Sequence, residues 1–170
     1  MLYLASGDLQ KEVLYFRRAL KAISEIGSFS LKLREHFFWK LSDLTEFATQ
    51  KEKFLISSGT LLEDAEWADL VLFSSSTAAD ECVLLGVPTW QLSSFRSDAS
   101  ALSFDIQIPK YYSLQELKIA LSKSQKIGPS APELNLRKRI EENTFFRADG
   151  KSAERTVNIF GQLLEKTRSY

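Results

Sequence analysis

Two patterns of apolar and polar positions alternate along the chain, and together they predict its secondary structure. Short apolar or alternating runs of β-favouring residues predict strands at 1–5, 29–34, 53–57, 70–73, 88–91 and 104–108. Apolar residues at three- and four-residue spacing predict helices at 9–26, 43–50, 61–68, 78–85, 113–123, 133–143 and 150–168. Such alternation of strand and helix predicts an α/β fold: a parallel sheet of about six strands with helices on both faces, in three layers.

The helix predicted at 9–26 has the clearest pattern. Asp8 precedes it as a candidate N-cap and Gly27 follows it as a stop. Its apolar face is formed by Val13, Phe16, Leu20 and Ile23. Ser113 with Glu116 three residues later predicts a capped start for the helix at 113–123.

Two shorter helices are predicted to bury one side each. In 61–68 the acidic residues Glu63, Asp64 and Glu66 should face outward, and the inward residues are Leu61, Leu62, Ala65 and Ala68. In the helix that ends before Gly86 the inward residues are Ala78, Cys82 and Leu85.

The final helix has an apolar stripe, formed by Ala153, Val157, Phe160 and Leu164. Packing against the sheet of this chain would explain the stripe, and so would an exposed surface for a partner. The segment 126–132 before the last two helices has the composition of a loop.

Length and composition limit the class of protein. The chain has 170 residues, which suits a single domain, and its 22 basic and 22 acidic side chains cancel. This balance gives no electrostatic reason to bind nucleic acid. One cysteine and one histidine exclude an internal disulfide and a Cys/His metal site, so no metal is expected. No apolar run is long enough to cross a membrane, and we expect a cytoplasmic chain without a transmembrane segment.

Polar residues gather where the predicted strands end. In a parallel α/β sheet, ligands bind outside the carboxyl ends of the strands, near the point where the strand order reverses. The groups expected at that edge are Ser6 to Asp8, His36, Ser57 to Thr60, and Ser74 to Glu81.

The stretch 69–91 contains a strand, a hydroxyl-rich turn, a short helix and a further strand. Thr77 followed by Asp80 is similar to a capping box, so the backbone N–H groups of residues 78–80 should begin the helix unpaired and attract an anion. Ser75, Ser76 and Thr77 add hydroxyl donors for phosphate oxygens, and the Glu81 carboxylate could accept two ribose hydroxyls. The alternative is that Thr77 only caps a helix and Glu81 is a solvated acid.

The same stretch resembles a known family. Ser75-Ser-Thr77, then Glu81, then Gly86-Val-Pro88, after a strand introduced by Ala68-Asp69, is similar to the donor-binding half of a GT-B glycosyltransferase. The segment 149–155 also resembles that family's ending, and the likeness runs from about residue 2 to residue 164. It implies that residues 1–170 are one Rossmann-like domain whose N-terminal acceptor-binding partner is absent.

The resemblance implies roles for the matching residues. Ser75, Ser76 and Thr77 would hold the donor phosphate, and Glu81 would hold ribose or sugar hydroxyls. The segment 32–36 is similar to an element of bacterial surface-polysaccharide transferases whose histidine contacts phosphate, which assigns that role to His36. The nucleobase would be edged by Ser58, Gly59, Thr60 and Leu61, and other cleft residues would be Gly7, Asp8, Arg34 and Gln91.

Two departures from familiar patterns bear on this assignment. Phe37 follows His36 where the transferases have proline, so the nucleotide stays open between UDP and CMP or CDP types. The turn after the first strand has a single glycine, Gly7, so neither a dinucleotide fingerprint nor a P-loop is present.

These features favour a nucleotide-sugar-binding domain of a glycosyltransferase, in surface-polysaccharide synthesis. The resemblance implies a nucleotide-sugar substrate and no further cofactor. It also implies an acceptor domain or a separate subunit as partner, and it allows the full enzyme to associate peripherally with a membrane. Isolated, the domain should bind nucleotide weakly and transfer nothing. A nucleotide-sugar epimerase half-domain and a non-catalytic interaction subunit of the same fold remain alternatives.

Overall fold

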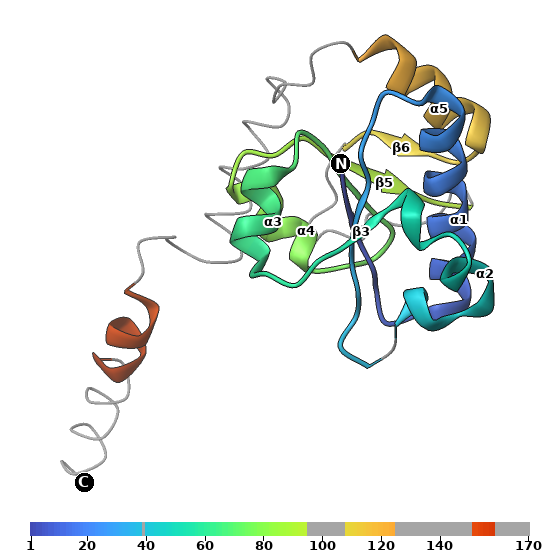
Figure 1. Ribbon diagram of the computed structural model, residues 1–170. Coiled ribbons are helices and arrows are strands. Elements are labelled where there is room, and N and C mark those ends of the chain that lie inside the picture. Colours follow the sequence, from blue (N-terminus) through green and yellow to red (C-terminus); the bar gives the residue numbers. More distant parts are fainter. Residues whose placement is uncertain (39, 95–107, 125–150, 159–170) are drawn as a thin grey trace, which may run out of the picture.

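Six parallel strands form one sheet in the order β3-β2-β1-β4-β5-β6 in the computed structural model (Figure 1). The structure describes residues 1–38, 40–94, 108–124 and 151–158. Its strands are β1 (Leu2–Leu4), β2 (Lys32–Arg34), β3 (Leu55–Ile56), β4 (Val71–Phe73), β5 (Thr89–Leu92) and β6 (Lys110–Tyr111). Its α-helices are α1 (Leu9–Ile26), α2 (Thr45–Ala48), α3 (Leu61–Trp67), α4 (Ala78–Leu84) and α5 (Leu114–Lys123), and its 3₁₀ helices are η1 (Leu41–Asp43) and η2 (Lys51–Lys53). A further helical segment covers 152–158.

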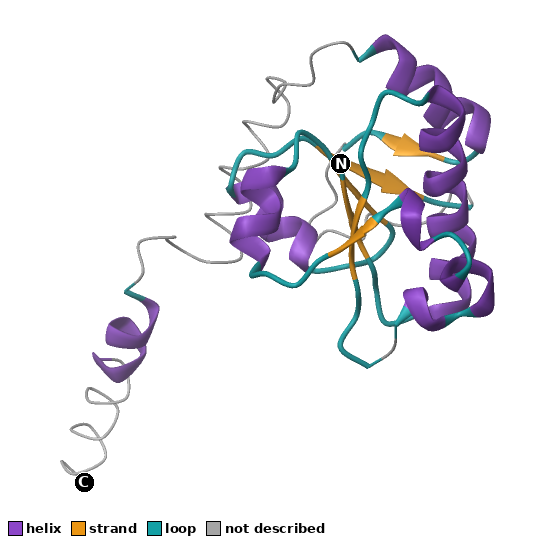
Figure 2. Ribbon diagram, viewed as in Figure 1, coloured by secondary structure: helices purple, strands orange, loops and turns teal. Residues whose placement is uncertain are grey.

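Helices cover both faces of the sheet (Figure 2). Figure 1 shows α1, α2 and α5 on one side and α3 and α4 on the other. The predicted three-layer α/β architecture is therefore confirmed. The strand order is that of a Rossmann-like fold, and it reverses between β1 and β4.

The central strands alternate their side chains between two cores. Tyr3 of β1 and Leu72 of β4 pack with α1 and α5, whereas Leu4 and Phe73 pack with α3 and α4. Each of these four side chains is at most 1% exposed. Both faces of β1 and β4 are thus buried, as expected of strands at the centre of a parallel sheet.

The helix predicted at 9–26 is confirmed with both ends. The Asp8 carboxylate accepts a hydrogen bond from the Lys11 N–H, and Gly27 ends the helix at φ +74°, a left-handed conformation that favours glycine. The predicted start of α5 is also confirmed, because Ser113 Oγ accepts from the Glu116 N–H at 3.1 Å.

Some inward and outward assignments were wrong. In α3, Asp64 was expected outside but is 2% exposed, and Leu62 was expected inside but is 50% exposed. In α4 the buried residues are Ala79, Asp80, Cys82 and Val83, while Leu85 is 47% exposed. A seven-residue helix has only two turns, so a small rotation changes which apolar residues it buries.

Several predicted elements differ in extent or cannot be compared. The strand predicted at 53–57 is split between η2 and the two-residue β3, and the helix at 43–50 is η1 followed by α2. The strand predicted at 104–108 lies outside the described residues except for residue 108, and the sixth strand is β6. The loop at 126–132, the helix at 133–143 and most of the final helix also lie outside the described residues. Of the predicted stripe, the structure describes Ala153 and Val157, and both are exposed.

Candidate functional site

A cleft of about 280 Å³ opens at the carboxyl ends of β1, β2 and β4. It lies at the reversal of strand order, where ligands of such sheets bind. We call it the strand-end cleft. Its lining comes from three separate segments, namely Leu4, Ala5, Arg34, Glu35, His36, Phe37, Ser76, Thr77 and Ala78. The fold thus brings together four of the predicted site residues, Arg34, His36, Ser76 and Thr77.

The turn between β4 and α4 supplies hydroxyl groups, but Thr77 does not cap the helix as predicted. Thr77 is already helical, at φ −64° and ψ −22°, and its side chain makes no capping hydrogen bond. The N–H groups of Ala79 and Asp80, expected to be unpaired, donate to the carbonyls of Ser76 and Thr77 at 3.1 Å each. Ser76 and Thr77 line the cleft, and neither hydroxyl bonds to another described residue. Ser75 is exposed beside them.

His36 lies against the turn that follows β1. A Cβ built on Gly7 would lie 3.9 Å from both Cε1 and Nε2 of the imidazole, an ordinary van der Waals distance, which places the ring beside this turn. His36 Nδ1 accepts a hydrogen bond from the Phe38 N–H at 3.3 Å. Neutral imidazole therefore carries its proton on Nε2, and the side chain can act as a donor from that atom.

Arg34 connects the strand-end cleft to a second pocket of about 430 Å³. Its Nη1 donates to the Gly59 carbonyl at 2.9 Å and to the Asp64 carboxylate at 2.8 Å. All its hydrogen bonds to described residues use Nη1, which leaves Nε and Nη2 of the guanidinium for a ligand. Lys32 is the second cation on Asp64, at 3.4 Å.

The four residues predicted to contact the nucleobase do not lie together in the structure. Ser58 and Gly59 line the second pocket, beside Lys32 and Asp64. Thr60 instead forms a capping box with Glu63: its Oγ1 accepts from the Glu63 N–H at 3.2 Å, and its N–H donates to the Glu63 carboxylate at 2.6 Å. Leu61 packs against the core beneath α3 and α4. A ligand in the second pocket would therefore meet Ser58 and Gly59 rather than Thr60 and Leu61.

The remaining predicted residues lie outside the lining of the strand-end cleft. Asp8 caps α1 and pairs with Lys11 at 3.4 Å. Gln91 is 3% exposed, and its Nε2 donates to the Ser74 carbonyl at 2.9 Å, so it supports the turn from below. Glu81 is exposed on α4. Its predicted contact with ribose stays a prediction.

Sequence reasoning missed Glu12, which is fully buried beneath the same edge of the sheet. Its carboxylate accepts hydrogen bonds from the hydroxyls of Tyr3, Ser6 and Ser74. Burial raises the pKa of Glu12, and the three hydroxyl donors oppose that rise. The signal was present in the sequence: Glu12 precedes Phe16 by four residues and so interrupts the apolar stripe of the helix.

Other groups on the described part of the chain have structural roles. Burial raises the pKa of the Cys82 thiol to about 12, which keeps it protonated and unreactive, as expected of a core residue. Within the described ranges no group of three or more His, Cys, Asp or Glu side chains is placed to hold a metal ion. None of the helices in those ranges has the length and hydropathy needed to cross a bilayer.

Comparison with known proteins adds evidence at the level of the fold. No family model matches the sequence, and no curated protein matches it. Among solved structures, the chain is similar to a crystal structure described as the glycotransferase of kitacinnamycin, with a TM-score of 0.55 and 12% sequence identity. The match covers 82% of this chain but only 38% of that one. The chain thus has a glycosyltransferase-like fold and spans well under half the length of that protein.

Proposed function

We propose that this chain is the nucleotide-sugar-binding domain of a glycosyltransferase. The observation that carries the proposal is the meeting of Arg34, His36, Ser76 and Thr77 in one cleft at the reversal of strand order. A guanidinium, an imidazole N–H and two hydroxyls are all donors, and donors in one cleft suit an anion with several oxygens, such as a diphosphate. The distant likeness to a glycosyltransferase structure supports the same class.

Glycosyl transfer breaks the bond between the anomeric carbon and the phosphate oxygen, so negative charge develops on the departing nucleotide. Donors fixed around that phosphate stabilise the transition state more than the ground state. In our proposal Arg34 Nη2, His36 Nε2 and the Ser76 hydroxyl hold this leaving group. The acceptor and its base would come from a further domain or subunit, which agrees with the partial coverage of the similar structure.

The second pocket extends the proposal to the nucleoside. Ser58 and Gly59 line it, and Arg34 borders both spaces through its bond to the Gly59 carbonyl. A phosphate on one side of Arg34 and a pyrimidine base on the other would fit UDP or CMP and CDP types. A role in surface-polysaccharide synthesis remains part of the proposal, resting on the resemblance of the segment 32–36 alone.

The first prediction tests this proposal by nucleotide binding. UDP, CDP, CMP and GDP are compared by thermal shift, and the best of them by calorimetry, because a ligand that binds only the native state raises its melting temperature. Ser76→Ala and His36→Ala should each weaken binding about tenfold, as the loss of a hydrogen bond to a charged group predicts. Ser122→Ala is the matched control, since this residue is exposed and its hydroxyl bonds to the Lys118 carbonyl within α5.

Two outcomes would contradict the proposal. If no nucleotide at millimolar concentration stabilises the protein, the domain does not bind nucleotides, and a non-catalytic interaction subunit becomes the better interpretation. If a nucleotide binds but Ser76→Ala and His36→Ala bind it as tightly as Ser122→Ala does, the site lies elsewhere on the molecule.

A further inference from the structure

The Glu12 carboxylate joins three elements beneath the strand-end cleft. It is 0% exposed, on the first turn of α1. Its Oε2 accepts from the Tyr3 hydroxyl on β1 at 2.6 Å. Its Oε1 accepts from both the Ser6 hydroxyl, at 2.7 Å, and the Ser74 hydroxyl. Ser6 follows β1 and Ser74 follows β4, so one carboxylate oxygen binds the ends of the two strands at which the sheet order reverses.

Each of these serines begins a turn that reaches the cleft. Gly7, next to Ser6, lies against the His36 ring. Ser76 and Thr77 follow Ser74 after one residue and line the cleft. Gln91 holds the Ser74 carbonyl at 2.9 Å, so Ser74 is fixed both by its side chain and by its backbone.

A carboxylate suits this place better than an apolar side chain would. Three buried hydroxyls from β1 and from the turns after β1 and β4 need an acceptor in one small volume, and a carboxylate has two oxygens with room for about four hydrogen bonds. An apolar residue at position 12 would complete the stripe of α1 but would leave three buried donors without an acceptor.

We propose that Glu12 is a positioning residue, which holds the turns at 6–8 and 74–77 in the arrangement that the phosphate of the ligand requires. The identity of the ligand rests on the proposed function above. The positioning role itself concerns only the two turns, so it can be tested separately.

The test compares Glu12→Ala, Glu12→Gln and Leu117→Ala, the last being a fully buried residue of α5 that serves as the control for a general loss of stability. Amide hydrogen exchange is measured at 6–8 and 74–77, and affinity is measured for UDP and inorganic diphosphate. In Glu12→Ala the amide exchange rate at both turns should be at least tenfold higher than in Leu117→Ala. Its affinity for UDP and for inorganic diphosphate should be at least fivefold lower than that of the unaltered protein. Glu12→Gln should recover part of each effect, since its amide oxygen still accepts a hydrogen bond.

Each result decides one question. Equal exchange at the two turns in Glu12→Ala and Leu117→Ala would overturn the positioning role, whatever the affinity. If the unaltered protein binds neither anion, the proposed function fails, while exchange at the turns still tests Glu12. Should Glu12→Ala not fold, Ser74→Ala replaces it: removing this one bond should raise exchange at 74–77 and leave 6–8 near the unaltered rate, and equal rises at both turns would refute the inference.

Discussion

Asp64 and Glu12 are both buried carboxylates, but their surroundings satisfy them in different ways. Asp64 pairs with two cations of β2, Lys32 and Arg34, and Lys32 in turn lies 4.3 Å from the centre of the Trp67 ring. Among the described residues no cation bonds to Glu12, and its partners include three hydroxyls. Burial of a carboxyl group without a neighbouring cation disfavours its ionised form.

The second prediction concerns Glu12 and pH. Burial raises its pKa above the ordinary value of 4.5, so the folded protein holds this proton more tightly than the unfolded chain does. The corresponding stabilisation is present below the unfolded pKa and is lost as pH rises through the folded one. Compared with Glu12→Gln, which cannot ionise, the unaltered protein should lose stability between about pH 4.5 and its folded pKa.

Urea unfolding of both proteins, from about pH 4 to pH 8, measures this difference. The free energy of unfolding of the unaltered protein minus that of Glu12→Gln should fall as the pH rises toward the folded pKa of Glu12 and stay level above it. A constant difference would show that Glu12 titrates alike in the folded and unfolded states. A rising difference would mean that the hydroxyl donors outweigh burial.

At the scale of elements, α1 shows how local and tertiary requirements agree. Its Asp8 cap and its Gly27 stop are properties of the neighbouring backbone, and its apolar stripe matches the face that the sheet covers. The shorter helices have fewer such constraints. α3 begins with a complete capping box, but which of its side chains are buried depends on the cations of β2 that attract Asp64.

The third prediction tests the end of α1. Gly27→Ala should lower the free energy of unfolding by about 1 kcal/mol, because alanine is strained at positive φ. Nothing lies within 4 Å of the Cβ that alanine would add, so the cost should come from the backbone alone. Urea unfolding with Ser24→Ala as the control, an exposed site on the same helix, measures it. A Gly27→Ala protein as stable as the control would show that the helix can end in another way.

At the scale of the whole molecule, one sheet separates two cores. The larger core, between the sheet and α1 and α5, includes an aromatic group centred on Phe16, whose ring lies 5.2, 5.0 and 5.1 Å from those of Tyr3, Phe47 and Phe54. The smaller core lies under α3 and α4. Because β1 and β4 contribute side chains to both, damage to one core should weaken the other.

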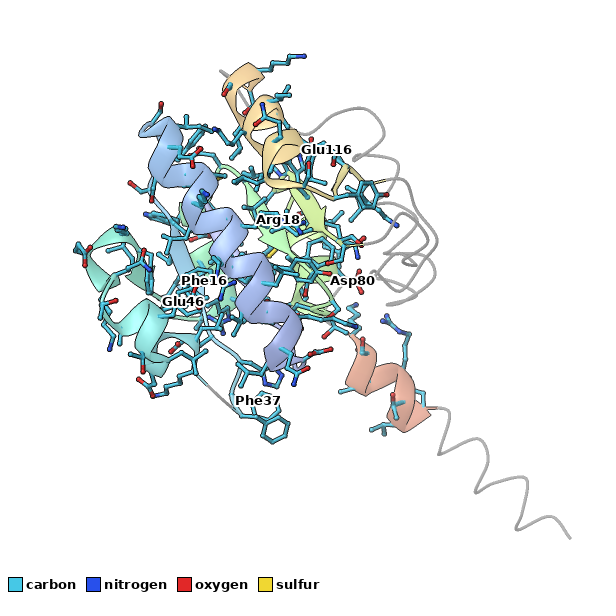
Figure 3. All side chains as sticks on the ribbon, turned by 90° about the vertical axis from the view of Figure 1, so that its right-hand side faces the viewer. Phe16, Arg18, Phe37, Glu46, Asp80 and Glu116 are labelled. Atoms are coloured by element: carbon cyan, nitrogen blue, oxygen red, sulfur yellow. The ribbon has the colours of Figure 1, made fainter. Side chains whose placement is uncertain are left out.

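The fourth prediction follows from this arrangement. Phe16→Ala should destabilise the protein by about 3–5 kcal/mol, the usual cost of removing a buried aromatic ring. Phe37→Ala is the matched control, since Phe37 is 82% exposed and projects from the loop after β2 (Figure 3), and it should cost less than about 0.5 kcal/mol. Urea unfolding followed by far-ultraviolet circular dichroism and by tryptophan fluorescence should give coincident curves for both variants. Separate transitions would show that the two cores unfold independently.

The sequence alone determined the class of fold and much of the secondary structure. Strand and helix periods depend on neighbouring residues, so the buried run at 70–73, the stripe of α1 and the caps at Asp8, Gly27 and Ser113 could all be recognised from local chemistry. The gathering of Arg34, His36, Ser76 and Thr77 also followed, because parallel strands place their carboxyl ends at one edge.

Tertiary structure alone decided which polar groups remain for a ligand. Gln91 bonds to the Ser74 backbone and one atom of Arg34 bonds to Asp64, and neither partnership follows from a residue's type. Glu12 and Asp64 became buried because partners distant in sequence converge on them, Ser74 on the one and Lys32 and Arg34 on the other. A hydrophobic pattern records the side of an element that faces the core, but the choice of hydrogen-bond partner across the core depends on how the elements pack.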